Sequence, residues 1–282
     1  MTMKWDTIET FENAVIQHGP LNNRIYLMKA GDCRADLPVR LIEKAREQGY
    51  SKIFAKVRAD QASSFLKTGY RAEAEVPGFY KGKQTAVFLG YYLDKARSRS
   101  GDQSKLEAVR QLAEKKTDDG ESNFSQLDKR FVLKQCSESD AERMARIYQT
   151  VFPSYPFPVH EPDYLIETMR SHIDYFCVEK EGELVALSST EKDVENQNAE
   201  MTDFATLPEW RGLGFAKFLL AFMEERAREN AILTAYTIAR AISPGMNITF
   251  SRLGYVFGGQ LVNNTQISGN LESMNVWYKS LE

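Results

Sequence analysis

Residues 200–228 read EMTDFATLPEWRGLGFAKFLLAFMEERAR, and this stretch decides the fold. It combines a short extended run, a turn marked by Pro208, a glycine loop and an amphipathic helix. Gly212 and Gly214 let the backbone approach a ligand closely, because glycine carries no Cβ atom. The helix that follows points its free N–H groups toward the loop. The stretch therefore predicts a cradle for a pyrophosphate group.

The two flanks of the loop predict a strand before it and a helix after it. Thr202, Phe204 and Thr206 alternate with a second face, as in a strand. Apolar residues then recur at intervals of three and four along one helix stripe: Phe215, Phe218, Leu219, Phe222, Met223 and Ala227. A nucleotide P-loop is disfavoured because the Gly-Lys-[Ser/Thr] ending is missing, and a Rossmann fingerprint because a third glycine is missing. An ordinary strand–turn–helix corner is the alternative.

The loop Arg211–Ala216 fits the pattern [Gln/Arg]-x-x-Gly-x-[Gly/Ala] and resembles the acetyl-CoA loop of the Gcn5-related N-acetyltransferase (GNAT) superfamily. From residue 131 onward the expected elements also follow the order of that superfamily, β-α-α-β-β-β-α-β-α-β-β. The resemblance implies a mixed α/β sheet fold with acetyl-CoA as cosubstrate and no metal. It implies that acetyl-CoA is bound by Phe204, Ala205, Thr206, Arg211, Gly212, Leu213, Gly214, Phe215 and Ala216. Asn247 is a further candidate, for the amide arm of the cofactor, unless it caps or packs its own helix.

The bulk composition describes a globular protein of one large or two ordinary domains. The 282 residues are 43% hydrophobic and 27% charged, with a net charge of −3, which argues against a nucleic-acid or anionic-membrane partner. No apolar run approaches the ~20 residues of a membrane span. The three cysteines have no metal-like spacing, so neither a disulfide framework nor a zinc site is indicated. Without a signal-peptide pattern, we expect a cytoplasmic protein.

The chain divides into three expected regions: a domain at 1–95, a charged linker at 96–129 and the catalytic domain at 130–282. In the first region, a helix from Leu37, a strand from Ile53, a helix ending at Tyr70 and a strand pair repeat the order of residues 218–279. No glycine loop occurs in this first copy. We therefore expect a degenerate GNAT-like half-domain that covers the substrate face or forms a subunit contact, as in a homodimer. Chance similarity of two α/β segments is the alternative.

Acetyl transfer to an amine needs a base for the amine proton and donors that polarise the thioester carbonyl. Glu200 lies eleven residues before Arg211, and its resemblance to the base glutamate of the histone-acetylating branch makes it the first candidate. Asp203 is the second, although it faces the opposite side of the strand unless a bulge reorients it. A solvated strand-edge carboxylate is the alternative for both.

Many members of the superfamily carry a Tyr that protonates the departing thiolate, at a position that Phe250 occupies here. Phenylalanine cannot donate a proton. Either another group does so, with Tyr255 and Tyr236 as candidates, or the thiolate leaves unprotonated.

Four phrases of the chain resemble a narrower family, the bacterial and archaeal β-lysine N6-acetyltransferases. They are VPGFY from Val76, YPFP from Tyr155, MTDFAT from Met201 and GGQLVNNTQISGNLESMNVWYK from Gly258. This resemblance implies acetylation of the terminal amine of β-lysine. It also implies lysine 2,3-aminomutase as a pathway neighbour, in compatible-solute synthesis or in lysine catabolism.

A small diamino acid needs a receptor for its carboxylate and acceptors for its second amine. We expect Arg240 to bind the carboxylate, Asn263, Asn264 and Asn275 to line the pocket, and Tyr155 to form part of its lid. A surface ion pair is the alternative for Arg240, and a turn for the adjacent asparagines. Other functions left open are acetylation of a polyamine, another amino acid or a protein lysine, and non-catalytic sensing of acyl-CoA.

Overall fold

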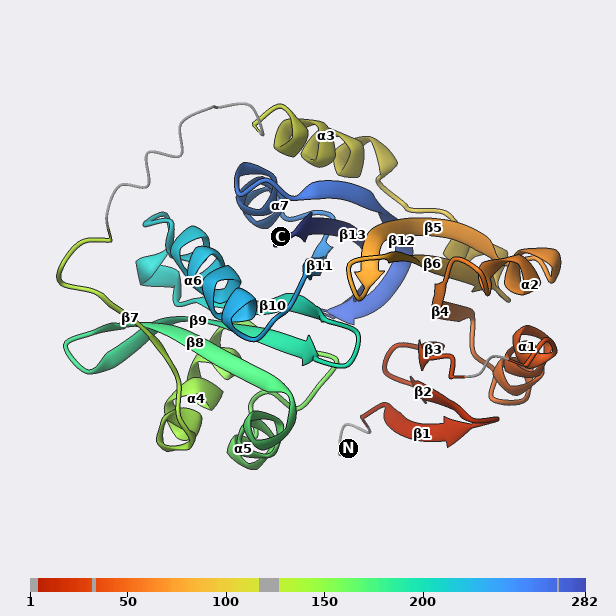
Figure 1. Cartoon of the computed structure of the whole chain (residues 1–282), viewed down its shortest axis with the longest axis horizontal. Helices are drawn as coiled ribbons and strands as arrows, with labels where there is room; N and C mark the ends of the chain where they lie inside the picture. The colour runs from red at the N-terminus through yellow and green to blue at the C-terminus, as the bar shows by residue number, and fades with distance from the viewer. Residues whose placement is uncertain (1–4, 32–33, 117–126, 268) are drawn as a thin grey trace.

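The computed structural model describes residues 5–31, 34–116, 127–267 and 269–282. Its strands form one mixed sheet of 13 strands, in the order β1-β2-β3-β4-β6-β5-β12-β13-β11-β10-β9-β8-β7. The sheet divides at the contact of β5 with β12 into an N-terminal half and a C-terminal half (Figure 1). The expectation of a mixed α/β fold is confirmed.

The N-terminal half contains six strands and two helices. Three antiparallel strands open it, and helices alternate with strands after them: β1 (Thr7–Phe11), β2 (Ala14–Gly19), β3 (Arg24–Lys29), α1 (Leu37–Glu47), β4 (Lys52–Arg58), α2 (Ala62–Lys67), β5 (Arg71–Tyr80) and β6 (Gln84–Tyr92). Pro38 stands in the first turn of α1, where its missing N–H group costs no hydrogen bond. Leu41 and Ala45 of this helix are fully buried in one apolar cluster with Ile25 and Ile53 of the sheet.

The C-terminal half follows the element order that the sequence predicts. It contains β7 (Val132–Gln135), α4 (Ala141–Val151), α5 (Pro162–Ser171), β8 (Ile173–Lys180), β9 (Glu183–Asp193), β10 (Asn198–Thr206), α6 (Phe215–Glu229), β11 (Thr234–Arg240), α7 (Pro244–Arg252), β12 (Val256–Ile267) and β13 (Asn270–Ser280). Short 3₁₀ turns occur at η1 (Lys95–Ser98), η2 (Glu138–Asp140) and η3 (Pro208–Trp210).

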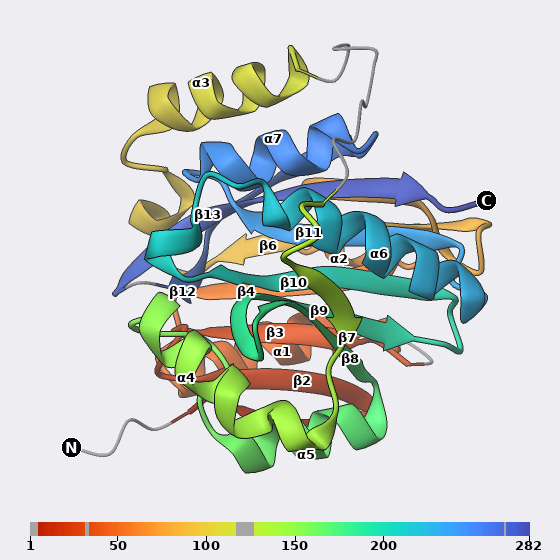
Figure 2. The ribbon, with the colours of Figure 1, turned by 90° about the vertical axis from the view of Figure 1, so that its left-hand side faces the viewer.

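Helices cover both faces of the C-terminal sheet. Figures 1 and 2 show α6 and α7 on one side and α4 and α5 on the other. Met201 of β10 is buried in one cluster with Leu219 and Met223 of α6. Leu187 of β9 is buried in a second cluster with Tyr148 of α4 on the opposite face. The layers therefore follow from the apolar stripes of the helices and the alternation of the strands.

Outward from the contact of β5 with β12, the two halves repeat the same succession of strands. One side runs β5-β6-β4-β3-β2-β1, and the other runs β12-β13-β11-β10-β9-β8-β7. Counted from this contact, β4 corresponds to β11 and β5 corresponds to β12. A helix precedes each of these strands in the chain: α1 and α2 in the N-terminal half, and α6 and α7 in the C-terminal half. The sheet register joins β5 to β12 through one pair, Ala74 with Gly259.

Buried polar groups fix the junction between the two halves. Lys52 of β4 donates to the Val262 carbonyl of β12 at 2.8 Å and forms an ion pair with Glu73 of β5 at 2.9 Å. The side chains of Lys52 and Glu73 are 0% and 5% exposed. Arg24 of β3 donates to the Asn264 carbonyl. Ring contacts add to this junction, since Phe79 of β5 lies 4.9 Å from Tyr236 of β11 between ring centroids.

The region expected to be a linker contains a packed helix, α3 (Gln103–Glu114). Asp102 caps its N-terminus by accepting from the Lys105 amide at 3.4 Å. Ala113 is fully buried in the cluster beneath α7, and its carbonyl accepts from the Ser251 hydroxyl at 2.7 Å. Residues 117–126 of the expected linker lie outside the described residues. No helix within the described ranges is long and apolar enough to cross a membrane.

Candidate active site

The glycine loop takes the left-handed conformation that its composition favours. Gly212 has a φ of 86° and Gly214 a φ of 74°, and Gly214 is the N-cap residue of α6. A Cβ atom added at Gly212 would meet no atom within 4 Å, so the space above this backbone is open. Arg211 holds the start of the loop, because its Nε donates to the Thr206 carbonyl at 3.2 Å. The loop and the N-terminus of α6 thus form an open anion cradle.

Strands β10 and β11 separate beside this loop. Their parallel register contains three pairs and ends at Glu200 and Tyr236, although β10 continues to Thr206 and β11 to Arg240. Beyond Glu200, β10 keeps its antiparallel partner β9 on the other side. The opened edge of β10 carries backbone N–H and C=O groups that can bind an extended ligand in the way an added strand would.

Three side chains form a row across the sheet at the point of separation. Glu200 is the register partner of Glu191 on β9 and of Tyr236 on β11. Because Met201 points into the core under α6, the alternation of the strand turns Glu200 to the opposite face. Burial, and after it the charge of Glu191, raises the pKa of Glu200 to about 8. A carboxyl group with such a pKa is suited to accept a proton near neutral pH.

A bulge in β10 brings Asp203 to the same face as Glu200. The register with β9 shifts between Thr202 and Ala205, and Asp203 has a φ of 54°. Its carboxylate accepts from the hydroxyls of Ser189, at 2.5 Å, and of Tyr155. Burial raises the pKa of Asp203, and these hydrogen bonds oppose the rise. The structure therefore brings together three predicted site residues, Glu200, Asp203 and Tyr155.

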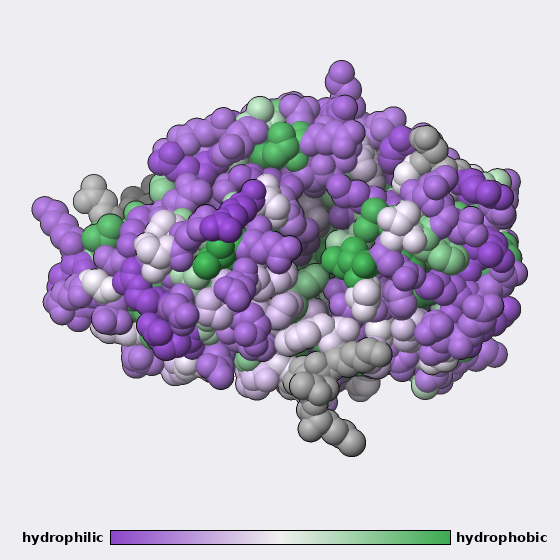
Figure 3. Space-filling view, turned by 90° about the horizontal axis from the view of Figure 1, so that it is seen from below, coloured by the Kyte–Doolittle hydropathy of each residue, from purple (hydrophilic) through white to green (hydrophobic). Residues whose placement is uncertain are grey.

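The N-terminal half contributes side chains that the sequence analysis did not include. The Lys56 ammonium of β4 lies 3.5 Å from the Tyr236 hydroxyl and 5.2 Å from the centre of the Phe79 ring. Tyr26 of β3 interacts electrostatically with Lys56, Glu200 and Glu191. Seen from below, the molecule is hollowed near its middle (Figure 3). The face of β10 that carries Glu200 is thus met by charged and aromatic side chains of β3, β4 and β5.

Two of the residues expected to contact the substrate, Arg240 and Asn263, are held by protein partners. Arg240 forms a bidentate ion pair with Glu272, at 2.7 and 2.6 Å. The Asn263 amide donates to the carbonyls of Arg97 and Arg99, each at 2.9 Å, so it supports the junction of the halves. Asn264 and Asn275 are 1% and 0% exposed. The ion pair with Glu272 agrees with the alternative given for Arg240 in the sequence analysis.

The contacts of Asn247 fit the alternative given for it, a residue that packs its own helix. Its side-chain nitrogen donates to the carbonyls of Arg240 at 3.0 Å and Ser243 at 2.7 Å. Its side-chain oxygen accepts from Asn275 and from the Trp277 indole, both at 2.8 Å. An amide offers two donors and two acceptor positions, so these four bonds use all of them. Asn247 is fully buried and fastens α7 to β13.

The two candidate proton donors occupy different surroundings. Tyr255 is 1% exposed and packs in the core beside Phe250, with ring centroids 5.1 Å apart. Tyr236 lies beside Glu200 in the sheet, as its register partner. Burial raises the pKa of both hydroxyls well above the ordinary range of a tyrosine. The placement favours Tyr236 over Tyr255 as the donor for the departing thiolate.

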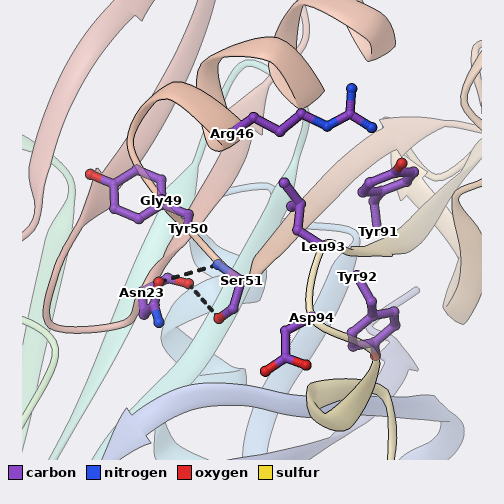
Figure 4. Close-up of a pocket in the computed structure, with 9 residues that line it drawn as sticks. All are labelled: Asn23, Arg46, Gly49, Tyr50, Ser51, Tyr91, Tyr92, Leu93 and Asp94. Carbon is purple, nitrogen blue, oxygen red and sulfur yellow. Dashed lines mark hydrogen bonds between the residues drawn. The ribbon is translucent and has the colours of Figure 1, made fainter.

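A separate open pocket of about 590 Å³ lies in the N-terminal half (Figure 4). The lining residues come from the turn between β2 and β3, from the end of α1 and the turn after it, and from the end of β6 and the residues beyond it: Asn23, Arg46, Gly49, Tyr50, Ser51, Tyr91, Tyr92, Leu93 and Asp94. Ser51 is bonded to Asn23 on its floor, with its hydroxyl 3.2 Å from the Asn23 carbonyl. None of the predicted catalytic or cofactor-binding residues lines this pocket.

Comparisons with known proteins agree with this arrangement. The family described as "Acetyltransferase (GNAT) family" matches residues 141–247. The chain is 40% identical to the β-lysine N(6)-acetyltransferase of Methanococcus maripaludis, over 98% of this chain and 100% of that protein. It is 36% identical to the β-lysine N(6)-acetyltransferase of Methanosarcina mazei, over 76% of this chain and 85% of that protein, and 30% identical to the N-acetyltransferase YodP of Bacillus subtilis, over 95% and 96%. The opened strand pair, the glycine loop and these similarities together show that the chain belongs to the GNAT acetyltransferase family.

Proposed function

We propose that this protein transfers the acetyl group of acetyl-CoA to the terminal amine of β-lysine. The observation that carries the proposal is the 40% identity to a β-lysine N(6)-acetyltransferase over 98% of this chain and all of that protein. Similarity of this extent includes the N-terminal half, which faces the predicted base. The raised pKa of Glu200 supports the proposed chemistry from the structure.

The residues around the glycine loop fit the phosphates and the amide arm of acetyl-CoA, which supplies the acetyl group as an activated thioester. The open space at Gly212 and the N-terminus of α6 suit the phosphates. The opened edge of β10 at Phe204, Ala205 and Thr206 suits the amide arm. Leu213, with half its surface exposed, lies beside them in the loop.

Glu200 acts as the general base for the acceptor amine. As the amine nitrogen bonds to the carbonyl carbon, the carbon–sulfur bond breaks and the amine proton passes to the Glu200 carboxylate. The hydroxyl of Tyr236, beside Glu200 in the sheet, donates a proton to the departing sulfur. Asp203 holds Tyr155 through the hydrogen bond between their side chains, and this contact closes the catalytic face.

We also infer that residues 1–95 form a degenerate GNAT-like domain that covers the substrate face. The repeated succession of strands on the two sides of the β5–β12 contact supports this division. Residues 96–129 then connect it to the catalytic domain at 130–282.

The function is tested by thiol release from acetyl-CoA with β-lysine, lysine, spermidine and a lysine peptide as acceptors. We expect β-lysine to give the highest kcat/KM. A higher value for spermidine or for the peptide would retain the acetyltransferase chemistry and overturn the proposed acceptor. Binding of acetyl-CoA without turnover of any amine would point to an acyl-CoA sensor.

A further inference from the structure

Lys56 is an ammonium group placed inside the catalytic face by the N-terminal half. It lies beside two neighbouring aromatic rings, 5.2 Å from the centre of Phe79 and 5.7 Å from the centre of Tyr236. Its hydrogen bond to the Tyr236 hydroxyl, at 3.5 Å, is long, whereas an ammonium offers three donors. Within the described part of the chain, no carboxylate lies within salt-bridge distance of this nitrogen. This partly buried charge therefore has no direct anionic partner among the described residues.

Tyrosine hydroxyls and carboxyl groups around Lys56 favour its protonated form. Burial would lower the pKa of Lys56, but Tyr26, Tyr80 and the carboxylates of Glu200 and Glu191 outweigh burial and raise it. Glu191 is turned partly to solvent, with a side chain 38% exposed and 3.9 Å from His172. A partly buried cation that lies beside two rings, with carboxylates only at longer range, gains stability from an anion that completes its coordination.

We infer that Lys56 binds the carboxylate of the acceptor, which makes the N-terminal half the part of the protein that selects an amino acid over a simple amine. The inference rests on the proposed function, since β-lysine carries its carboxylate at the end opposite the reacting amine. Tyr236 connects the two ends of the site, because it is the register partner of Glu200 and the hydrogen-bond partner of Lys56. The hydroxyls of Tyr26 and Tyr80, which act electrostatically on the same ammonium, are candidates to donate to the second carboxylate oxygen.

This assignment also accounts for Arg240. The Arg240 guanidinium already forms the bidentate pair that it favours, with the Glu272 carboxylate. It is therefore not free to bind the carboxylate of a substrate in the same way. Lys56 carries the charge that a substrate carboxylate needs and lies on the catalytic face.

The experiment compares three acceptors on three proteins. The acceptors are β-lysine, its amide β-lysinamide and its decarboxylated analogue, and the proteins are wild type, Lys56→Met and Lys44→Met. Lys44 is the matched control, because it is also a lysine of the N-terminal half whose ammonium lies over a ring, 4.9 Å from the centre of Phe11, away from the site. The readouts are kcat and KM for each acceptor, with circular dichroism as the check on folding.

In wild type, we expect kcat/KM for β-lysine to exceed the value for either analogue without a carboxylate by about tenfold to a hundredfold. Lys56→Met should reduce this preference to within about threefold, through a higher KM for β-lysine, while Lys44→Met retains it. If wild type has equal kcat/KM values for the three acceptors, the inference is overturned, and no variant is needed to decide it. A Lys56→Met protein that keeps the preference, or that loses kcat equally for all three, overturns it as well. In both cases turnover of β-lysine by wild type would leave the proposed function intact.

Discussion

Glu200 and Tyr236 are the last register partners of the parallel pair β10 and β11. The strands separate immediately beyond them, so the carboxyl group and the hydroxyl stand together where an extended ligand can enter the sheet. The same position brings Glu191, on β9, beside Glu200 on its other side. One sheet position thus brings together the proposed proton acceptor, the proposed hydroxyl donor and the proposed entrance for the acyl group.

Glu200→Gln should reduce kcat by about 10²- to 10⁴-fold, because the amide cannot accept the amine proton. Affinity for acetyl-CoA should remain within about twofold, since the proposed cofactor contacts lie on the loop and on the later part of β10. Steady-state kinetics and calorimetry measure the two quantities. Glu183→Gln, an exposed position at the start of β9, is the control. An unchanged kcat in Glu200→Gln would remove Glu200 from the mechanism.

The pH dependence of kcat/KM follows from the raised pKa of Glu200. Because the pKa of Glu200 in the protein without substrate is raised to about 8, kcat/KM of wild type for β-lysine should rise with pH through about 8. Glu200→Gln should lose this limb of the profile. A wild-type profile that is already flat between about pH 5 and about pH 9 would show that another group is the base.

The same group links stability to pH. Between the ordinary value of 4.5 and about 8, the folded protein holds a proton on Glu200 that the unfolded chain releases. The contribution of Glu200 to the free energy of unfolding therefore falls as pH rises through this window. Between about pH 5 and about pH 8, the free energy of unfolding of Glu200→Gln should rise relative to that of wild type by on the order of 1–2 kcal/mol. The effect is no larger because Glu200 is partly exposed, and solvent screens its charge. Urea unfolding at the two pH values measures this, and an unchanged difference would contradict it.

Gly212→Ala and Gly182→Ala make a matched pair for the cofactor loop. Both glycines have a φ of 86°, and a Cβ atom at either meets nothing within 4 Å. Each substitution should cost about 1 kcal/mol of stability through the strained backbone. Gly212→Ala alone should also raise KM for acetyl-CoA, by about tenfold, because its methyl group projects into the space proposed for the phosphates. Equal KM values in the two variants would place the phosphates elsewhere.

Glu73→Ala should destabilise the protein by about 3–5 kcal/mol, because it leaves the buried Lys52 ammonium without its charged partner. Asp60→Ala is the control: it removes the exposed pair with Arg58, whose side chains are 43% and 59% exposed, and should cost less than about 1 kcal/mol. Urea unfolding measures both. A cost for Glu73→Ala no larger than that of the control would show that the junction of the two halves does not depend on this pair.

Local patterns made the C-terminal half predictable from the sequence. The alternation before Pro208, the glycines at 212 and 214 and the apolar stripe of α6 are short-range signals, and each corresponds to the element that the structure contains. The bulge at Asp203 was foreseen as the condition that would turn this carboxylate toward the site. No sequence pattern places a bulge at one residue, since the shift depends on how β10 packs against β9.

Contacts between the halves were not predictable in the same way. Lys56 and Tyr236 are far apart in the sequence. No sequence pattern predicts that a lysine on a strand will face the carboxyl group of the candidate base, Glu200. Asn263 and Arg240 were expected near the substrate because of their chemistry, but their partners, Arg97 and Glu272, depend on the tertiary fold. The spacing of charged residues identifies candidates, and the pairing of strands decides which of them meet.

The most direct test is a competition assay in which wild-type protein receives acetyl-CoA and an equimolar mixture of β-lysine, lysine and spermidine. The products are identified by mass spectrometry and by two-dimensional NMR. Our account predicts one main product, β-lysine with a single acetyl group on its terminal nitrogen. Acetylation chiefly of lysine or spermidine, or of the other nitrogen of β-lysine, would contradict it.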